Sequence, residues 1–352
     1  MPDENSIDIS ERAETVLRGL ISRYIEDGTP VGSRTLSKEP GLALSPATIR
    51  NVMADLEECG LIEAPHTSAG RVPTQAGYRL FINKMLRVEP VKKRSIDLLE
   101  HRLSSSVDEK ALLTSASEML SQMTSFAGIV SVPSKKHVHI RQIEFLKISQ
   151  QRVIAILITD DGQVQNKLLN THREYGDSEL VEAANFFNAE YAAKTLEGVK
   201  ADLLKHLQSD HQSMHREMRT AIKIAGSLFD DDNDGEAVLV SGENNLLSIP
   251  DFAELEKLKQ LFDTFKTKQV LFDLLQKSLA TGGVNIFIGE ESGYKPFREC
   301  SVISAPYEID SERVGVLGII GPTRMNYDEV VSTVDITAKL LGSALTANSQ
   351  NL

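Results

Sequence analysis

The chain has 352 residues, which is enough for two or three domains with cores of their own. Its 41% hydrophobic and 25% charged residues are ordinary for a globular protein. It has no run of about 18 apolar residues that would span a membrane, and its N-terminus, MPDENSIDIS, is unlike a signal peptide. Cys59 and Cys300 fall in separate predicted domains. These features predict a cytoplasmic protein with reduced thiols and no membrane partner.

The net charge of −12 is unevenly distributed along the chain. Residues 1–94 hold 13 Lys and Arg against 13 Asp and Glu, which leaves 25 against 37 for the remainder. Residues 31–94 alone hold 10 basic against 6 acidic residues. An acidic protein can still present a local basic face, so the overall charge does not exclude binding to nucleic acid.

The N-terminal pattern predicts a winged helix-turn-helix. Apolar residues at helical spacing predict a first helix over 10–27, which Ser10 caps and Gly28-Thr29-Pro30 ends. A short helix and a turn follow, and a second helix opens at Ser45-Pro46 and ends at Gly60. Leu61-Ile62 and Val72 predict the strands of a wing with a Gly-Arg tip, and a further helix starts at Thr74.

The second helix is amphipathic. Ile49, Val52, Met53 and Leu56 recur at core spacing, whereas the opposite side carries small and polar residues: Ala47, Arg50, Asn51 and Ala54, with Thr48 on the flank. Small residues let a helix enter the major groove, where Arg, Asn and Thr read base edges. The wing tip, His66 to Arg71, carries donors that suit phosphate or the minor groove. A short polar helix before a hairpin also occurs in domains that never bind DNA, so the pattern alone leaves both interpretations open.

The remainder of the chain alternates between helical and strand periodicity. Helices are predicted at 94–104, 108–124, within 177–229, and at 251–264, 267–280 and 326–346. Strands are predicted at 127–132, 140–148, 152–159, 163–170, 237–240, 284–288, 299–306 and 314–320. Strands, a long mostly helical interruption and strands again indicate one sheet divided by an inserted unit.

Several motifs resemble chemical sites, and each has a simpler interpretation. The loop 230–235 opens like a calcium loop, but Ser241 stands where a bidentate Glu is needed, so an acidic solvated loop is favoured. His211 and His215 share a helix face without a third ligand nearby, which favours a surface pair over a metal site. The glycines of 315–321 lie within a β run and do not form a nucleotide-binding loop. We therefore predict no metal, no cofactor and no enzyme.

Two strings, LSPATIRNVMADLEECGLIEAPHTSAGRVPTQAGYR and GVLGIIGPTRMNYDEVV, resemble the HrcA family of heat-inducible transcription repressors, and the similarity runs over most of the chain. The resemblance implies an α+β multidomain protein with a GAF-like domain that an inserted dimerisation domain interrupts. The expected limits are 1–94 for the DNA-binding domain, 95–171 and 251–352 for the GAF-like domain, and 172–250 for the insert. It also implies a homodimer, the CIRCE inverted repeat of double-stranded DNA as operator, and the GroE chaperonin as a partner that heat diverts elsewhere.

We expect Arg50 and Asn51 to contact base edges with support from Thr48, Ser45 and Arg34 to contact phosphate, and the wing residues His66, Thr67, Ser68 and Arg71 to anchor the tip. The basic run at 92–94 is predicted as a solvated linker, with a phosphate contact as the alternative. Two other function classes remain open: a small-molecule sensor built on the GAF-like domain, and an enzyme with an accessory helix-turn-helix.

Overall fold

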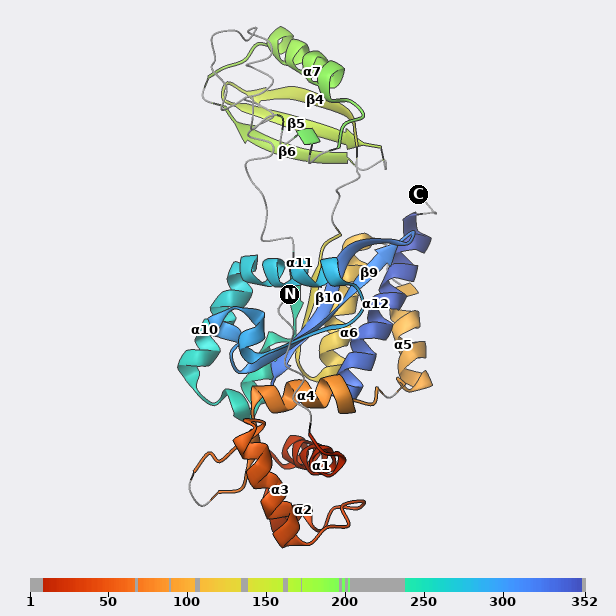
Figure 1. The fold of residues 1–352 in the computed structure, drawn as a ribbon. Helices are drawn as coiled ribbons and strands as arrows, with labels where there is room; N and C mark the ends of the chain where they lie inside the picture. Colours follow the sequence, from red (N-terminus) through yellow and green to blue (C-terminus); the bar gives the residue numbers. More distant parts are fainter. Residues whose placement is uncertain are drawn as a thin grey trace. The chain divides into compact units, whose positions relative to one another are not determined.

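The computed structural model describes residues 9–66, 69–88, 90–104, 108–133, 139–160, 164–171, 173–195, 198–199, 202 and 238–349. The chain divides into two compact units (Figure 1). The first combines Met1–Val132 with Asp234–Leu352, and the second is Pro133–Asn233. Within the first unit we distinguish an N-terminal domain (9–86) from a core domain (93–132 and 238–349).

The N-terminal domain has the predicted order of elements. They are α1 (Glu11–Asp27), α2 (Ser33–Leu36), α3 (Pro46–Glu58), β1 (Ile62–Glu63), β2 (Val72–Pro73) and α4 (Gln75–Met85). Ser10 caps α1 by accepting a hydrogen bond from the Ala13 backbone at 3.2 Å, and Gly28 ends it at φ 66°. Thr74 caps α4 in the same way at Gly77. Local capping signals therefore placed these helix ends correctly.

The core domain contains helices on both sides of a sheet. Its helices and 3-10 turns are α5 (Lys93–Ser104), α6 (Glu109–Thr124), η1 (Glu243–Ser248), η2 (Pro250–Phe252), α10 (Leu255–Thr267), α11 (Gln269–Thr281), η3 (Gly289–Ser292), η4 (Lys295–Phe297) and α12 (Tyr327–Ser349). Its strands are β3 (Ala127–Ser131), β7 (Val238–Ser241), β8 (Asn285–Ile288), β9 (Cys300–Ile309) and β10 (Glu312–Pro322).

In the described residues these strands form one antiparallel sheet in the order β7-β3-β10-β9-β8. Alternate residues point to opposite faces. Val130, Ile303 and Leu317 belong to the hydrophobic cluster of α6 and α12, whereas their neighbours Ile129, Val302 and Val316 belong to that of α10 and α11. Figure 1 shows the same layers, with α6 and α12 on one side of the strands and α10 on the other.

Gly315, Gly318 and Gly321 lie inside β10, as predicted for glycines that permit close packing. A Cβ atom on Gly318 would lie 2.4 Å from the Ile303 carbonyl oxygen of the neighbouring strand. This position therefore requires glycine for the approach of β9.

In its described residues, the second unit is a three-stranded antiparallel sheet with a helix on one face. Its elements are β4 (Ile140–Ser149), β5 (Arg152–Thr159), β6 (Val164–Asn170) and α7 (Asp177–Tyr191). The inner residues, such as Phe145 and Val153, share a hydrophobic cluster with Phe187 of α7. The Asn188 side chain fixes α7 on β4, since it accepts from the Ile143 N–H at 2.7 Å and donates to the Ile143 carbonyl at 3.0 Å.

The outer face of that sheet is also apolar. Leu146, Ile154 and Leu168 are cross-strand neighbours, and Ile158 pairs with Val164 in the same way. Leu146, Val164 and Leu168 are 48%, 62% and 50% exposed. No described element packs against this face, which we call the outer sheet face.

The second unit differs from the expected insert at both ends. The prediction placed the insert at 172–250 and assigned the strands at 140–170 to the interrupted sheet. In the structure these strands pair with one another and pack against α7, and the compact unit is Pro133–Asn233. The interruption itself is present. β3 precedes that unit in the sequence and β7 follows it, and the two strands pair in one sheet. Periodicity identified the strands, but it contains no information about which sheet a strand joins.

The helix α12 is long and apolar enough, over Tyr327–Asn348, to meet the length and composition of a membrane span. However, 56% of its most apolar window is buried inside the protein, and α12 packs against β9 and α6. The hydrophobic residues of α12 therefore pack in the interior of the core domain.

Two of the motifs considered above lie outside the described residues: the acidic loop 230–235 and the pair His211 and His215. In the part of the chain that the structure describes, no group of three or more His, Cys, Asp or Glu residues could hold a metal ion.

Candidate nucleic-acid interface

The helix α3 presents a polar face to solvent. Ile49, Val52, Met53 and Leu56 are at most 8% exposed and join the core of the N-terminal domain. On the other side, the exposed residues are Pro46, Ala47, Arg50, Asn51, Ala54, Asp55 and Glu58. Among the described residues, the Arg50 guanidinium has no hydrogen bond or ion pair to another side chain. The side chain predicted to read bases is thus available to a ligand.

The start of α3 is held by two of the predicted site residues. The Ser45 hydroxyl accepts a hydrogen bond from the Thr48 N–H at 3.1 Å, and the two hydroxyl oxygens lie 2.9 Å apart. Ser45 therefore caps the helix, which satisfies one of the free backbone donors of its first turn. Thr48 is half-buried by this contact, whereas Arg34, on α2, is exposed. The structure brings Ser45 and Thr48 together and leaves the side chains of Arg34 and Arg50 exposed.

The wing is short and is joined to the chain before α2. β1 and β2 pair Ile62 with Pro73 and Glu63 with Val72. Val31 and Arg71 exchange two backbone hydrogen bonds of 2.9 Å each. The neighbouring Gly70 allows this close approach, because a Cβ atom there would lie 2.5 Å from the Val31 carbonyl oxygen.

The wing arginine is engaged within the domain. Arg71 donates from Nε and Nη2 to Glu57 Oε2 of α3, at 2.9 and 2.8 Å. This pair links the wing to the end of α3, so Arg71 is oriented by the protein before any DNA is present. His66 is exposed at the start of the tip, while Thr67 and Ser68 lie outside the described residues.

The N-terminal domain is attached to the core domain through two sets of contacts, which we call the junction. In the first set, Arg324 forms an ion pair with Asp251 at 3.0 Å and donates from Nη1 to the Ile25 carbonyl of α1 at 3.0 Å. Its side chain is only 18% exposed. Burial and the nearby Asp251 carboxylate both raise the pKa of Tyr24, so this tyrosine stays neutral beside the ion pair.

The second set of contacts involves α4. Arg79 forms an ion pair with Glu291 and donates to the Ile286 carbonyl at 2.7 Å. Gln75 donates to the Ile288 carbonyl at 2.6 Å. The rings of Tyr78 and Tyr327 lie 6.0 Å apart, and burial raises the pKa of both hydroxyls.

Sequence reasoning missed the junction. The partner of Arg324 at α1 is about 300 positions away, at Ile25. No local pattern encodes such a pairing; the available signal was that Arg324 belongs to one of the two strings that resemble the family.

The comparisons with known proteins agree with this architecture. Residues 8–86 match the family model of the winged helix-turn-helix transcription repressor HrcA, DNA-binding, and residues 110–331 match that of the HrcA protein C-terminal domain. The heat-inducible transcription repressor HrcA of Methylobacillus flagellatus is 46% identical over 341 residues, which covers 97% of this chain and 99% of that protein. That of Chromobacterium violaceum is 48% identical over 341 residues, with coverages of 96% and 98%.

A solved structure, the crystal structure of a hypothetical protein at 2.2 Å resolution, has the same fold. It aligns with a TM-score of 0.64 at 23% identity and covers 97% of this chain and 100% of that one.

The winged helix-turn-helix with its solvent-facing α3 defines a DNA-binding transcription regulator. The chain belongs to the HrcA family of heat-inducible transcription repressors. It is accordingly a regulator and not an enzyme.

Proposed function

We propose that the protein binds the CIRCE inverted repeat as a homodimer and represses chaperone operons. The observation that most supports this proposal is the exposed face of α3, where Arg50 and Asn51 extend from a helix whose apolar side is buried. A single winged helix contacts few base pairs, whereas a two-fold dimer doubles the contacts and matches an inverted repeat. The operator and its genes are inferred from membership of the family, and a cytoplasmic location follows from the same role.

Within this proposal the site residues have separate tasks. Arg50 and Asn51 contact base edges in the major groove, and Thr48 orients them from the first turn of α3. Arg34 and Ser45 contact phosphate on either side of the helix. The wing residues His66, Thr67, Ser68 and Arg71 contact the adjacent backbone or minor groove.

The outer sheet face of the second unit supports the homodimer. It exposes Leu146, Val164 and Leu168 beside the half-buried Ile154 and Ile156. Contiguous apolar surface of this kind costs free energy in water and is a common site of subunit contact. We therefore assign the second unit as the inserted dimerisation domain and the core domain as the GAF-like domain.

The topology of the core domain supports dependence on the GroE chaperonin. β3 pairs with β7 and β10, which lie on the other side of Pro133–Asn233 in sequence. Such non-local pairing is slow to form, and it leaves apolar strand edges exposed until it is complete. Chaperonin would shorten that exposure, and its diversion to heat-unfolded clients would reduce the amount of active repressor.

The experiment is to measure binding to a CIRCE duplex and to a scrambled duplex by fluorescence anisotropy, at several salt concentrations, with protein refolded with and without chaperonin. We expect tight binding to CIRCE, weak binding to the scrambled duplex, and a larger active fraction after refolding with chaperonin. Equal affinity for the two duplexes, from protein with a cooperative melting curve, would contradict the proposed operator. An active fraction indifferent to chaperonin would contradict only the folding step.

A further inference from the structure

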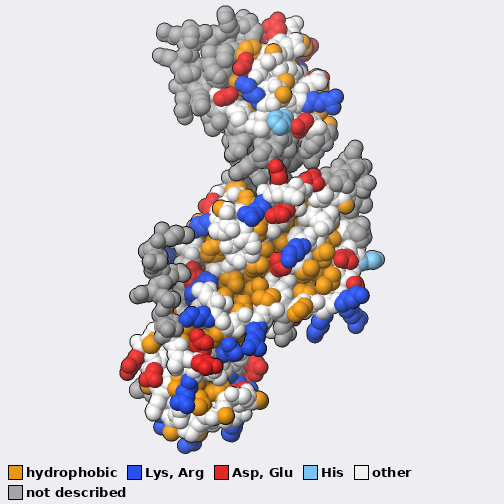
Figure 2. Space-filling model, turned by 45° about the vertical axis from the view of Figure 1, so that its right-hand side comes forward, with side chains coloured by type: hydrophobic (Ala, Val, Ile, Leu, Met, Phe, Trp, Pro, Cys, Tyr) orange, Lys and Arg blue, Asp and Glu red, His pale blue; other side chains and the backbone are white. Residues whose placement is uncertain are grey.

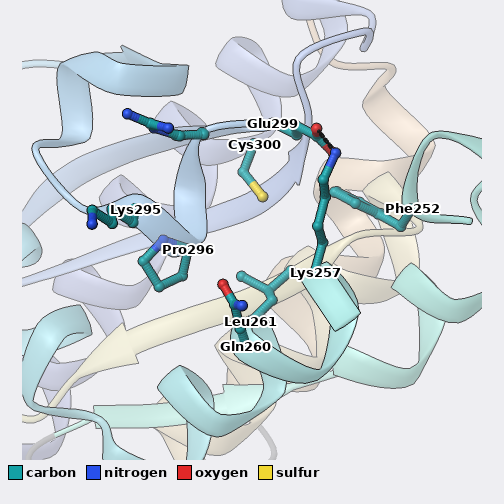
Figure 3. Close-up of a pocket in the computed structure, with 9 residues that line it drawn as sticks. Phe252, Lys257, Gln260, Leu261, Lys295, Pro296, Glu299 and Cys300 are labelled. Carbon is teal, nitrogen blue, oxygen red and sulfur yellow. Dashed lines mark hydrogen bonds and ion pairs between the residues drawn. The ribbon is translucent and has the colours of Figure 1, made fainter. Parts of the chain in front are cut away.

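The core domain contains a cavity between the end of η2, the first two turns of α10 and the start of β9. Its volume is about 330 Å³, within the range of small-ligand sites. Phe252, Leu261 and Cys300 form its floor and are at most 6% exposed. Figure 3 shows the Cys300 sulfur near the centre, with Pro296 on one side, Phe252 on the other, and Leu261 and Gln260 approaching from α10.

The floor of the cavity is uncharged. Burial raises the pKa of the Cys300 thiol to about 12, so it remains protonated near neutral pH. A buried thiol behaves as a small hydrophobic group. The floor therefore suits a hydrocarbon chain or ring.

The rim of the cavity is rich in cations. Lys257, Lys295 and Arg298 line it together with one carboxylate, Glu299. Lys257 is engaged by Glu299, as the dashed line in Figure 3 marks, and by Glu254 at 3.1 Å, and Arg298 pairs with Glu290 at 3.2 Å. Lys295 has no carboxylate partner among the described residues. The Lys295 ammonium thus lies beside an apolar floor without an ion pair to hold it.

The floor of the cavity adjoins the first contact of the junction. Phe252 directly follows Asp251 in η2, and Asp251 holds Arg324, which donates to the Ile25 carbonyl of α1. A ligand that displaces Phe252 would therefore move the residue that positions Arg324.

The rim adjoins the second contact of the junction. Arg298 pairs with Glu290, whose backbone N–H donates to the Gln75 side chain at 3.4 Å. The next residue, Glu291, holds Arg79 of α4. An anion that competes with Glu290 for Arg298 would loosen the turn that carries both of these contacts.

We propose that this cavity is an effector site for a small amphipathic carboxylate, whose apolar part lies on Phe252, Leu261 and Cys300 and whose carboxylate pairs with Lys295 and Arg298. Occupancy changes how the junction holds the N-terminal domain. The ligand site stands on the geometry of the core domain alone, whereas the effect on DNA binding rests on the proposed function. Coupling of this kind requires that the ligand bind two arrangements of the junction with different affinity.

The test uses full-length protein and calorimetric titration with octanoate as the probe. Octanamide supplies the same chain without the charge, and acetate supplies the charge without the chain. We expect one octanoate per chain, with both comparison compounds weaker by at least about tenfold, since each lacks one half of the recognition. Octanamide binding as tightly as octanoate, or uptake of octanoate at many sites without saturation, would overturn the carboxylate site.

Three variants assign the binding to this cavity. Lys295→Gln removes the ammonium that has no ion pair in the cavity rim and should weaken octanoate binding a few-fold, as expected for an exposed ion pair. Gln260→Trp places a large side chain at the exposed rim and should abolish binding. Lys259 lies on the same helix but does not line the cavity, so Lys259→Gln should bind octanoate like the unaltered protein. Thermal melting of all three checks the fold, and equal octanoate affinity across the folded set would place the site elsewhere.

The coupling is tested separately, by measuring CIRCE affinity with and without saturating octanoate. We expect a change of several-fold in the unaltered protein and none in Gln260→Trp. An unchanged affinity despite bound octanoate would overturn the coupling. Absence of specific CIRCE binding in both conditions would instead contradict the proposed operator and leave the calorimetric result intact.

Discussion

The exposed face of α3 and the outer sheet face of the second unit are both uncovered in the described chain, but their chemistry differs. The α3 face exposes small and polar residues, with Arg50 and Asn51 beside Ala47 and Ala54 and the acidic Asp55 and Glu58 toward its end, while every large hydrophobic residue of that helix is buried. The outer sheet face leaves Leu146, Val164 and Leu168 between 48% and 62% exposed. Figure 2 shows charged side chains of both signs over the N-terminal domain, which is at the bottom of the view, as in Figure 1.

This difference indicates two kinds of partner. A polar face costs little free energy in water, so it can stay exposed until it binds a charged polymer such as DNA. The phosphates of DNA supply most of the affinity in such binding. An apolar face costs about 25 cal/mol for each Å² left in water. A sheet that exposes such a face gains most from a second apolar surface, and a copy of the same chain offers one in a two-fold arrangement.

The largest predicted effect tests the apolar face. Leu168→Lys places a charge on this face, opposite Ile154 of the central strand β5. In a two-fold dimer the charge enters the interface twice, and we expect the dimer to weaken by at least about 3 kcal/mol because buried, unpaired charge is costly. Sedimentation velocity over a concentration series measures the change.

The matched control for that experiment is Val181→Lys. Val181 is 57% exposed on α7, outside the outer sheet face, so its substitution should leave the dimer intact. If Leu168→Lys remained as dimeric as this control, with unchanged secondary structure by circular dichroism, the subunit contact would have to lie on another surface.

The next prediction tests the polar face. Arg50→Ala should weaken CIRCE binding by about 1–3 kcal/mol and reduce discrimination against altered bases, because a bidentate base contact is lost. Its folding stability should change little, since Arg50 is exposed and has no described partner. Anisotropy titrations with CIRCE and single-base variants measure both effects. Unchanged affinity in a folded Arg50→Ala dimer would remove α3 as the recognition helix.

The two faces also differ in how far the sequence predicted them. The limits of α1, α3 and α4 follow from local signals: Ser10, Ser45 and Thr74 cap their starts, and Gly28 and Gly60 adopt the positive φ that ends a helix. The burial of Ile49, Val52, Met53 and Leu56 follows from their spacing. All of this information lies within a few residues of each element.

The second unit required information that the local pattern lacks. Its strands were predicted within a residue or two, yet their partners were not, because alternating apolar residues fit any sheet. The junction was missed for the same reason, since Arg324 meets Asp251 and Ile25 from a distant part of the chain. The pairing of Arg71 with Glu57 was also missed, although both residues were recognised as part of the DNA-binding domain.

A third prediction concerns the attachment of the polar face to the core domain. Arg324→Ala removes the ion pair to Asp251 and the hydrogen bond to the Ile25 carbonyl. Because these groups are partly buried, we expect a loss of about 1–2 kcal/mol in the free energy of unfolding. Urea denaturation followed by circular dichroism measures it.

Asp251→Asn serves as the graded comparison, because it keeps a hydrogen-bond acceptor beside Arg324 and removes only the charge. Its loss of stability should be smaller than that of Arg324→Ala. A loss as large in Asp251→Asn would mean that the ion pair, and not the hydrogen bond to α1, carries the attachment.

The smallest predicted effect concerns the wing. Glu57→Gln removes the carboxylate that holds Arg71, and both side chains are about a third exposed, so the cost in stability should be below about 0.5 kcal/mol. The same change removes a negative charge from the end of α3 and frees Arg71 for phosphate. We expect slightly tighter binding to CIRCE and scrambled DNA alike, because phosphate contacts carry no sequence information.

Arg71→Ala should have the opposite effect, weakening both duplexes equally and reducing the slope of log K against log salt by about one. Measuring this slope for Glu57→Gln, Arg71→Ala and the double variant separates the two contributions. If the double variant binds like Arg71→Ala, Glu57 acts only by restraining Arg71. If the double variant binds DNA more tightly than Arg71→Ala, the Glu57 carboxylate repels DNA on its own. In the unaltered protein Arg71 would then strengthen DNA binding partly by neutralising Glu57 at the end of α3.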